Sequence, residues 1–137
     1  MAHSLSFDLH HGYADFRRGI EIPAALKLGE EVVLCQAKID TGAEVCLFKR
    51  EIGETLGLRI ETGHPIELDS LGGILHAYGH SITLHTLGIE FDSVVYFAAT
   101  YGLRRNLLGR EGWLRKVRLA IVDYDSALYL SLYHDQA

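Results

Sequence analysis

The 137-residue sequence has few cysteines and few prolines, with two of each. Two cysteines, Cys35 and Cys46, are too few for the disulfide framework of a small secreted domain. Both lie in apolar surroundings, so we expect buried free thiols in a reducing compartment. The fourteen glycines are dispersed along the chain, which is typical of a domain with many turns.

Long apolar runs are also missing. The longest run, 94–99, is far too short to span a bilayer, and residues 1–11 do not resemble a secretory signal. Apolar residues make up 48% of the chain and charged residues 23%, a profile of folded rather than disordered proteins. We therefore expect one cytoplasmic domain, or the soluble domain of a longer protein, with no membrane partner.

The net charge of −5 argues against a general nucleic-acid binder. One segment, 104–118, runs against this charge, because it contains six basic residues and one acidic residue. A solvated basic face is the simpler interpretation of such a short run. The alternative is a site for acidic ligands or RNA, which would bind with a steep dependence on salt.

Short apolar segments separated by turns predict an all-β protein. Residues 1–19 show no clear period and are interpreted as an N-terminal arm, which leaves 20–137 as the folded domain. One short helix is expected over 49–56, with Gly57 placed to end it, and one or two helical turns over 109–115. Strands are expected over 20–28, 32–39, 45–48, 66–71, 74–84, 94–98, 117–122 and 127–132.

Asp40 is the most informative residue in the chain. An apolar strand leads directly into Asp40, Thr41 and Gly42, where glycine permits a sharp turn and a close approach to another backbone or a ligand. An isolated Asp-Thr-Gly triplet usually does no more than end a strand, because these residues are common in turns. The interpretation of Asp40 therefore depends on the rest of the sequence.

Several segments in order resemble the retropepsin-like aspartic peptidases. Residues 37–48, AKIDTGAEVCLF, resemble the active-site segment of that family, and 106–114, NLLGREGWL, resemble its apolar-apolar-Gly-Arg segment. Between them, 71–74 lie at the place of the flap tip. Residues 121–124 and 128–130, near the C-terminus, resemble the closing hairpin of bacterial members. The resemblance implies a closed or orthogonal β-barrel with one or two short helices, and three ordered segments are more specific than one motif.

The resemblance also implies an aspartic endopeptidase that cleaves peptide or protein substrates as a homodimer. The chain has one Asp-Thr-Gly, with Leu108 and Gly109 where a two-lobed enzyme would need a second aspartate. A twofold axis would bring two copies of Asp40 together to activate a water molecule. Thr41 would then hydrogen-bond across the axis, and the Gly42 carbonyl would bind the substrate backbone.

Further roles are carried over from the resemblance. It assigns substrate binding to Ala43, Glu44, Leu71, Gly72, Gly73 and Ile74, and structural support to Leu108, Gly109 and Arg110. Glu44 differs from the Asp, Ser or Thr that is common after Asp-Thr-Gly-Ala. Retroviral members pair an acid at that position with the arginine of the Gly-Arg segment, so we predict an ion pair between Glu44 and Arg110.

Other functions have weaker support in the sequence. The eight histidines show no closed ligand spacing, so we expect no metal and no cofactor. No nucleophile elbow is present, and Gly72-Gly73 lacks the ending of a phosphate-binding loop. The main alternative is a catalytically silent module that keeps the fold for binding or dimerisation. The intact Asp-Thr-Gly triplet favours the enzyme, because a retired site has no chemical need for Asp40.

Overall fold

The computed structural model describes residues 1–15 and 19–133, and most of these residues form strands. The strands are β1 (Leu9–Gly12), β2 (Glu21–Leu28), β3 (Glu31–Ile39), β4 (Leu47–Phe48), β5 (His64–Ser70), β6 (Gly73–Thr86), β7 (Ile89–Ala98), β8 (Asn106–Leu108), β9 (Val117–Val122) and β10 (Ala127–Leu132). The helices are α1 (Arg50–Thr55), η1 (Ile60–Thr62), η2 (Leu114–Lys116) and η3 (Asp123–Asp125). The all-β prediction is confirmed. Within the described ranges, no helix is long and apolar enough to cross a membrane.

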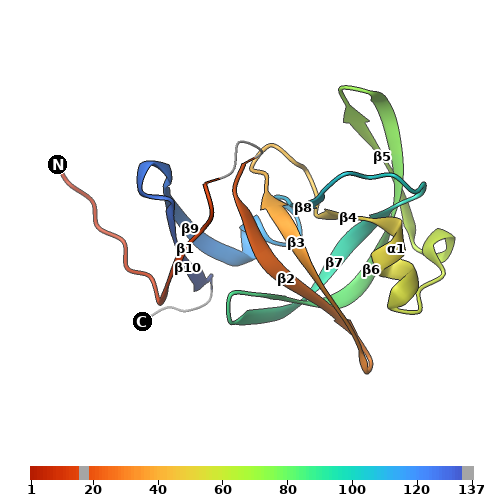
Figure 1. Ribbon diagram of the computed structural model, residues 1–137, viewed down its shortest axis with the longest axis horizontal. Coiled ribbons are helices and arrows are strands. Elements are labelled where there is room, and N and C mark those ends of the chain that lie inside the picture. Colours follow the sequence, from red (N-terminus) through yellow and green to blue (C-terminus); the bar gives the residue numbers. More distant parts are fainter. Residues whose placement is uncertain (16–18, 134–137) are drawn as a thin grey trace.

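Six strands close into a barrel (Figure 1). They follow the order β2-β3-β8-β4-β7-β6, and pairing of β6 with β2 completes the circuit. Most neighbours are antiparallel, but β3 runs parallel to β8, and β4 runs parallel to β7. The parallel pairing of β3 with β8 places the end of β3, which Asp40 follows, beside a segment from much later in the chain.

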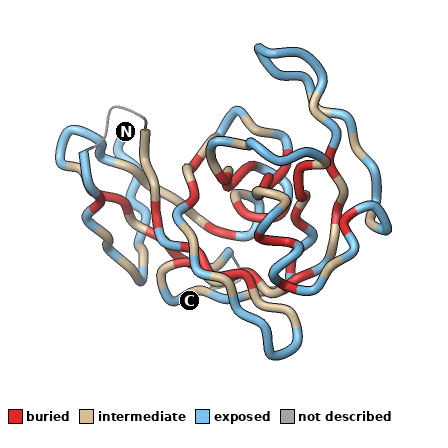
Figure 2. The backbone as a smooth tube through the Cα atoms, turned by 45° about the vertical axis from the view of Figure 1, so that its right-hand side comes forward, coloured by how far each residue is buried: buried red, intermediate tan, exposed pale blue. Residues whose placement is uncertain are grey.

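Strand β6 takes part in both the barrel and a projecting hairpin. Residues 77–86 pair with β7, whereas residues 73–79 pair with β5. The outer part of the β5–β6 hairpin thus extends beyond the barrel as a two-stranded arm (Figure 1), and its tip is exposed (Figure 2). At its base, a side chain at Gly63 would collide with the Gly79 carbonyl, and one at Gly79 would collide with Tyr96. The arm is therefore held tightly at its base and has no barrel strand against its tip.

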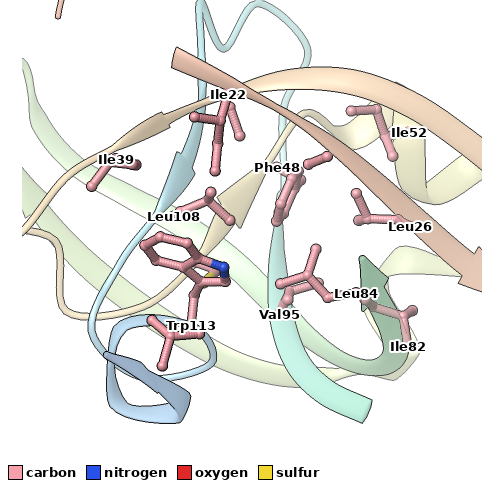
Figure 3. Packing of buried hydrophobic residues seen from close by; sticks show 14 of the residues in the cluster. Ile22, Leu26, Ile39, Phe48, Ile52, Ile82, Leu84, Val95, Leu108 and Trp113 are labelled. Atoms are coloured by element: carbon pink, nitrogen blue, oxygen red, sulfur yellow. The ribbon is translucent and has the colours of Figure 1, made fainter. Parts of the chain in front are cut away.

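The barrel interior is filled by large apolar side chains from every wall (Figure 3). Phe48, Phe97 and Trp113 are fully buried, and burial of each such side chain contributes about 1.5–3 kcal/mol. The indole N–H of Trp113 donates to the buried Thr86 hydroxyl at 3.0 Å, so its polar atom is satisfied.

A second, three-stranded sheet has the order β1-β10-β9. β9 and β10 form the expected closing hairpin, and β1 pairs with β10 from Leu9↔Leu130 to Gly12↔Ala127. No period in the sequence indicated β1, yet part of the segment interpreted as an irregular arm is a strand. The pairing explains why: β1 is half-buried against a single neighbour and needs no continuous apolar pattern.

Three of the six basic side chains of 104–118 have separate partners. Arg115 forms an ion pair with Glu111, Lys116 lies over the Phe91 ring, and Arg118 lies over the Phe7 ring. Each of these three side chains therefore has a different neighbour, which favours separate surface contacts over one continuous acid-binding surface.

The short helix α1 is joined to the barrel by Arg50. Its guanidinium pairs with Glu54 at 3.1 Å and with Glu61 at 2.5 Å, and it donates to the Ala99 carbonyl at 2.8 Å. The guanidinium also lies over Tyr101. Hydrogen bonding to Arg50 holds the pKa of Glu61 below its ordinary value of 4.5. α1 ends as expected, with Gly57 at positive φ after the last turn.

Replacing Arg50 with methionine is expected to make the free energy of unfolding fall less steeply as the pH is lowered. A carboxylate with a lowered folded-state pKa stabilises the fold above its unfolded-state pKa, and this contribution is lost as pH falls through the folded-state value. Urea unfolding should show wild type well above Arg50→Met near neutral pH, with a gap that narrows in acid. Among the described residues the exposed Arg59 side chain has no such ion pairs, and Arg59→Met is the matched control. A gap that is constant with pH would contradict the role given to Glu61.

Candidate active site

Asp40 lies directly after β3, at the mouth of the barrel. Its backbone N–H donates to the Leu108 carbonyl at 3.0 Å, and its own carbonyl accepts from the Ala43 N–H at 3.1 Å. The Gly42 N–H donates to the Asp40 carboxylate at 3.0 Å. A turn therefore orients the carboxylate, and the parallel strand β8 fixes the start of that turn. Asp40 is half-buried, while Thr41 and Gly42 are exposed.

The segment after β8 continues this support. The Arg110 N–H donates to the Ala43 carbonyl at 2.9 Å, and the Glu111 N–H donates to the Glu44 carbonyl at 2.9 Å. Gly109, just before these two residues, has no room for a side chain. A Cβ there would lie 2.8 Å from the Ala43 oxygen and closer still to the Val45 carbonyl oxygen. Leu108 is fully buried beside it. The three residues assigned to structural support thus contact the Asp40 turn or the core beside it, mainly through backbone atoms and the Leu108 side chain, and the assignment itself stays a prediction.

Asn106 is a supporting residue that the sequence did not single out. It is buried at the start of β8, and its side-chain oxygen accepts from the Lys49 N–H at 2.9 Å. Its amide nitrogen donates to the Gln36 carbonyl at 3.0 Å. The side chain therefore ties β3 to the chain that leaves β4. A polar residue beginning an apolar segment is the only indication of this role in the sequence.

A groove of about 420 Å³ lies in front of Asp40. One wall is the Asp40 turn and β4, and the other is the outer part of the β5–β6 hairpin, next to its tip. The lining residues are Asp40, Gly42, Ala43, Glu44, Val45, Leu47, Glu67, Leu68, Asp69, Ser70, Leu75 and Leu107. The lining is apolar apart from Ser70 and the acidic side chains. The groove thus brings segments that are far apart in the sequence next to Asp40, the aspartate of the Asp-Thr-Gly triplet.

The hairpin tip lies outside this lining. Leu71, Gly72, Gly73 and Ile74, which were expected to bind substrate, are all exposed and do not line the groove in the single chain. The register Ser70↔Gly73 makes Leu71-Gly72 a two-residue turn. Gly73 adopts φ 117, and its carbonyl accepts from the Ser70 hydroxyl at 2.8 Å. These residues thus form the exposed tip of a hairpin, and both its function as a flap and its binding of substrate stay predictions.

Two local expectations are corrected by the structure. Glu44 and Arg110 are both exposed, and no ion pair joins their side chains among the described residues. The two segments are held together by their backbones, which makes the side-chain pair unnecessary. The helical turns expected over 109–115 are also displaced, because Gly112 at φ 98 turns the chain and η2 forms only over Leu114–Lys116.

Cysteine and metal chemistry find no support at this site. Cys46 is buried beneath the Asp40 turn, and burial raises the pKa of its thiol to about 12. The pKa of Cys35 is raised in the same way to about 11, so both thiols stay protonated near neutral pH and are poor nucleophiles. Both cysteines are free. In the part of the chain that the structure describes, no group of three His, Cys, Asp or Glu side chains is placed to hold a metal ion.

Comparisons with known proteins agree on the fold. No protein-family model matches the chain, and no curated protein sequence matches it. The crystal structure of a retropepsin-like aspartic protease from Rickettsia conorii aligns with a TM-score of 0.67 at 20% identity, covering 90% of this chain and 99% of that one. EIAV protease in complex with the inhibitor HBY-793 aligns with a TM-score of 0.54 at 15% identity, covering 71% of this chain and 86% of that one. The chain therefore has a retropepsin-like fold, as the sequence resemblance implied.

Replacing Gly109 with alanine is expected to destabilise the protein by about 3 kcal/mol or more, at or above the upper end for overpacking. The added methyl group must displace the 43–45 backbone, so the Asp40 turn moves with it. Gly72→Ala is the matched control, since nothing lies within 4 Å of a Cβ there. Chemical denaturation would measure both variants. Equal stability of Gly109→Ala and wild type would show that the turn is not held by this contact.

Proposed function

We propose that the protein is an aspartic endopeptidase that works as a homodimer. The observation that carries the proposal is the position of Asp40, half-buried on an ordered turn, in a groove roofed by a flap-like hairpin. The proposal is supported by the retropepsin-like fold and by the resemblance of residues 37–48 to the active-site segment of that family. A binding module that had lost proteolysis would not need an oriented carboxylate there.

The need for a second copy follows from the chemistry of water activation. One aspartate must accept a proton from the water while another donates a hydrogen bond to the oxyanion. The chain has a single Asp-Thr-Gly triplet, so a second Asp40 must come from a second subunit. Thr41 is exposed, and its hydroxyl has no partner within the described part of the single chain. It is therefore available to hydrogen-bond across the twofold axis beside the two carboxylates.

The two Asp40 carboxylates share one proton in the proposed mechanism, because two like charges so close together cannot both ionise. The ionised carboxylate takes a proton from the bound water, whose oxygen attacks the peptide carbonyl. The protonated carboxylate donates to the carbonyl oxygen as negative charge develops on it. One carboxylic acid then passes its proton to the leaving nitrogen as the C–N bond breaks, and the pair is left with one shared proton again. The pair titrates as a unit.

The substrate lies in the groove as an extended strand. Its backbone pairs with the Gly42 carbonyl on one side and with the β5–β6 hairpin on the other, as in other cases of strand addition. Closure of the hairpin excludes water from the reaction. Leu71, Gly72, Gly73 and Ile74 at its tip reach the substrate only in that closed state. We place this activity in the cytoplasm, since both thiols are free.

Cleavage of a diverse peptide pool, read by mass spectrometry from acidic to neutral pH, tests the activity. Wild type is expected to cut at defined sites, and Asp40→Asn is expected to lose cleavage by at least about a thousandfold, since an amide cannot act as the base. Asp92→Asn removes a charge elsewhere on the surface and is the matched control. Cleavage by Asp40→Asn at the wild-type rate would exclude an aspartic mechanism.

Mixing subunits tests the dimer directly. When wild type and Asp40→Asn exchange in equal amounts at constant total protein, random pairing leaves about a quarter of the dimers with two aspartates. Activity should therefore fall to about a quarter of that of wild type, whereas independent monomers would retain about half. Sedimentation at the assay concentration checks that dimers are present. Retention of half of the activity would refute a shared site.

A further inference from the structure

Strand β3 has a neighbouring strand along most of its length on one side only. β2 pairs with 31–38, whereas β8 on the other side pairs with 37–39 alone. Within the described ranges, no strand lies against that other side of 31–36. The β2–β3 turn also projects beyond the barrel (Figure 1). We call residues 31–36 the open β3 edge.

The register with β2 determines which backbone groups the open β3 edge presents. The turn at 29–30 has two residues, so the alternation of an antiparallel pair directs the N–H and C=O groups of Val32 and Leu34 away from β2. The Gln36 carbonyl follows the same alternation, because it accepts from the Asn106 side chain on the β8 side. Among the described residues, the outward groups of Val32 and Leu34 have no hydrogen-bond partner.

The side chains beside these backbone groups are apolar and exposed. Val32 is 50% exposed and Leu34 is 79% exposed. Proteins commonly protect an open strand edge with lysine or proline, and 31–36 contains neither. Unpaired backbone groups between exposed apolar side chains are what an added strand needs for pairing and for burial.

The two ends of the open β3 edge differ in charge. Glu30 and Glu31 are exposed at the turn, and among the described residues neither forms an ion pair. At the other end, Cys35 lies in a pocket that is lined by three basic residues and one acidic residue. These charged residues are Lys49, Arg104, Arg105 and Glu21. The edge therefore runs from an acidic end to a basic end.

Lys49 brings its charge close to the basic end of the edge. Burial raises the pKa of the Cys35 thiol to about 11, and the positive charge of Lys49 opposes this rise. The Lys49 ammonium group therefore lies near the Cys35 side chain. In the part of the chain that the structure describes, this ammonium group belongs to no ion pair, so its charge is available to a carboxylate from outside the subunit.

We propose that two copies of the chain associate by antiparallel pairing of their open β3 edges. A twofold axis at Val33 sets Val32 of one copy opposite Leu34 of the partner subunit. In this register the outward N–H and C=O groups of both residues bond to the other copy, and the axis repeats each bond. The exposed Val32 and Leu34 side chains cover each other across the contact.

The same register matches the charges of the two copies. Glu31 lies opposite Cys35 of the partner subunit, on the same face of the joined sheet, and Lys49 of the partner subunit lies beside that cysteine. The axis repeats this pair at the other end of the contact. An edge that is complementary to itself in backbone, apolar surface and charge favours a second copy over an unrelated peptide.

This contact is separate from the proposed active site and does not rest on the proposed function. A strand rises about 3.3 Å per residue, so Val32 lies roughly 26 Å along the chain from Asp40. The two surfaces can therefore be occupied together, and pairing of β3 edges joins Asp40-paired dimers into larger assemblies. Because the open edge is short, the contact belongs to the small, weak class and depends on protein concentration.

Sedimentation equilibrium over a wide range of protein concentrations tests the contact. Val32→Lys places a charge on the open β3 edge and is expected to weaken this association by about tenfold or more. Val94→Lys is the matched control, because Val94 is also 50% exposed but lies on β7, and it should associate as wild type does. Equal average mass for wild type and Val32→Lys at every concentration would overturn the proposal.

Charge reversal tests the register. Glu31→Lys and Lys49→Glu each set like charges opposite one another and are expected to weaken association severalfold. The double variant Glu31→Lys with Lys49→Glu reverses both members of the pair and should restore association. Glu31→Lys with Arg59→Glu has the same net charge and should not restore it. Equal association of the two double variants would show a general charge effect and overturn the register.

The peptide-pool assay separates this contact from the proposed function. Val32→Lys should lose the larger assemblies and keep the cleavage of wild type. Absence of cleavage by wild type, together with an association that Val32→Lys weakens, would refute the peptidase and support the β3 contact. Loss of both cleavage and association in Val32→Lys, with Val94→Lys active, would overturn the separation of the two surfaces.

Discussion

The close contact between Gly109 and the 43–45 backbone is the constraint on which the rest of the site depends. Only a residue without a side chain lets the segment after β8 lie against the Asp40 turn, and the two N–H groups that follow then bond to the Ala43 and Glu44 carbonyls. These bonds hold the turn at a depth that leaves the carboxylate half-buried. The groove wall, β4 and the buried Trp113 all follow from this placement.

Local patterns in the sequence were sufficient for most of the fold. Alternation and apolar clusters predicted the strands, because each barrel strand buries one face, and glycine placed the end of α1. β1 was missed because its order comes from pairing with β10, more than a hundred residues away along the chain. The prediction of a Glu44–Arg110 ion pair was wrong for a similar reason. It compared side chains with those of the family and could not show that backbone hydrogen bonds already join the two segments.

The candidate site was predictable only where it coincides with a motif. Asp40, Gly42, Ala43 and Glu44 meet in the groove because they share one turn. The opposite wall comes from β5 and β6, whose lining residues follow from cross-strand register and the curvature of the sheet. Only the assembled structure shows that residues from these separate segments line the same groove.

Because β6 belongs to both the barrel and the hairpin, the length of the arm can change without a change in the barrel. Residues 73–76 pair with β5 and with no barrel strand, whereas 77–86 are fixed by β7. Adding one residue pair to the arm, with one residue in each strand, would leave the barrel register untouched; the same insertion nearer the base would turn core side chains outward. Related proteins could therefore diverge in how much substrate they cover by lengthening or shortening this arm, without rebuilding the core.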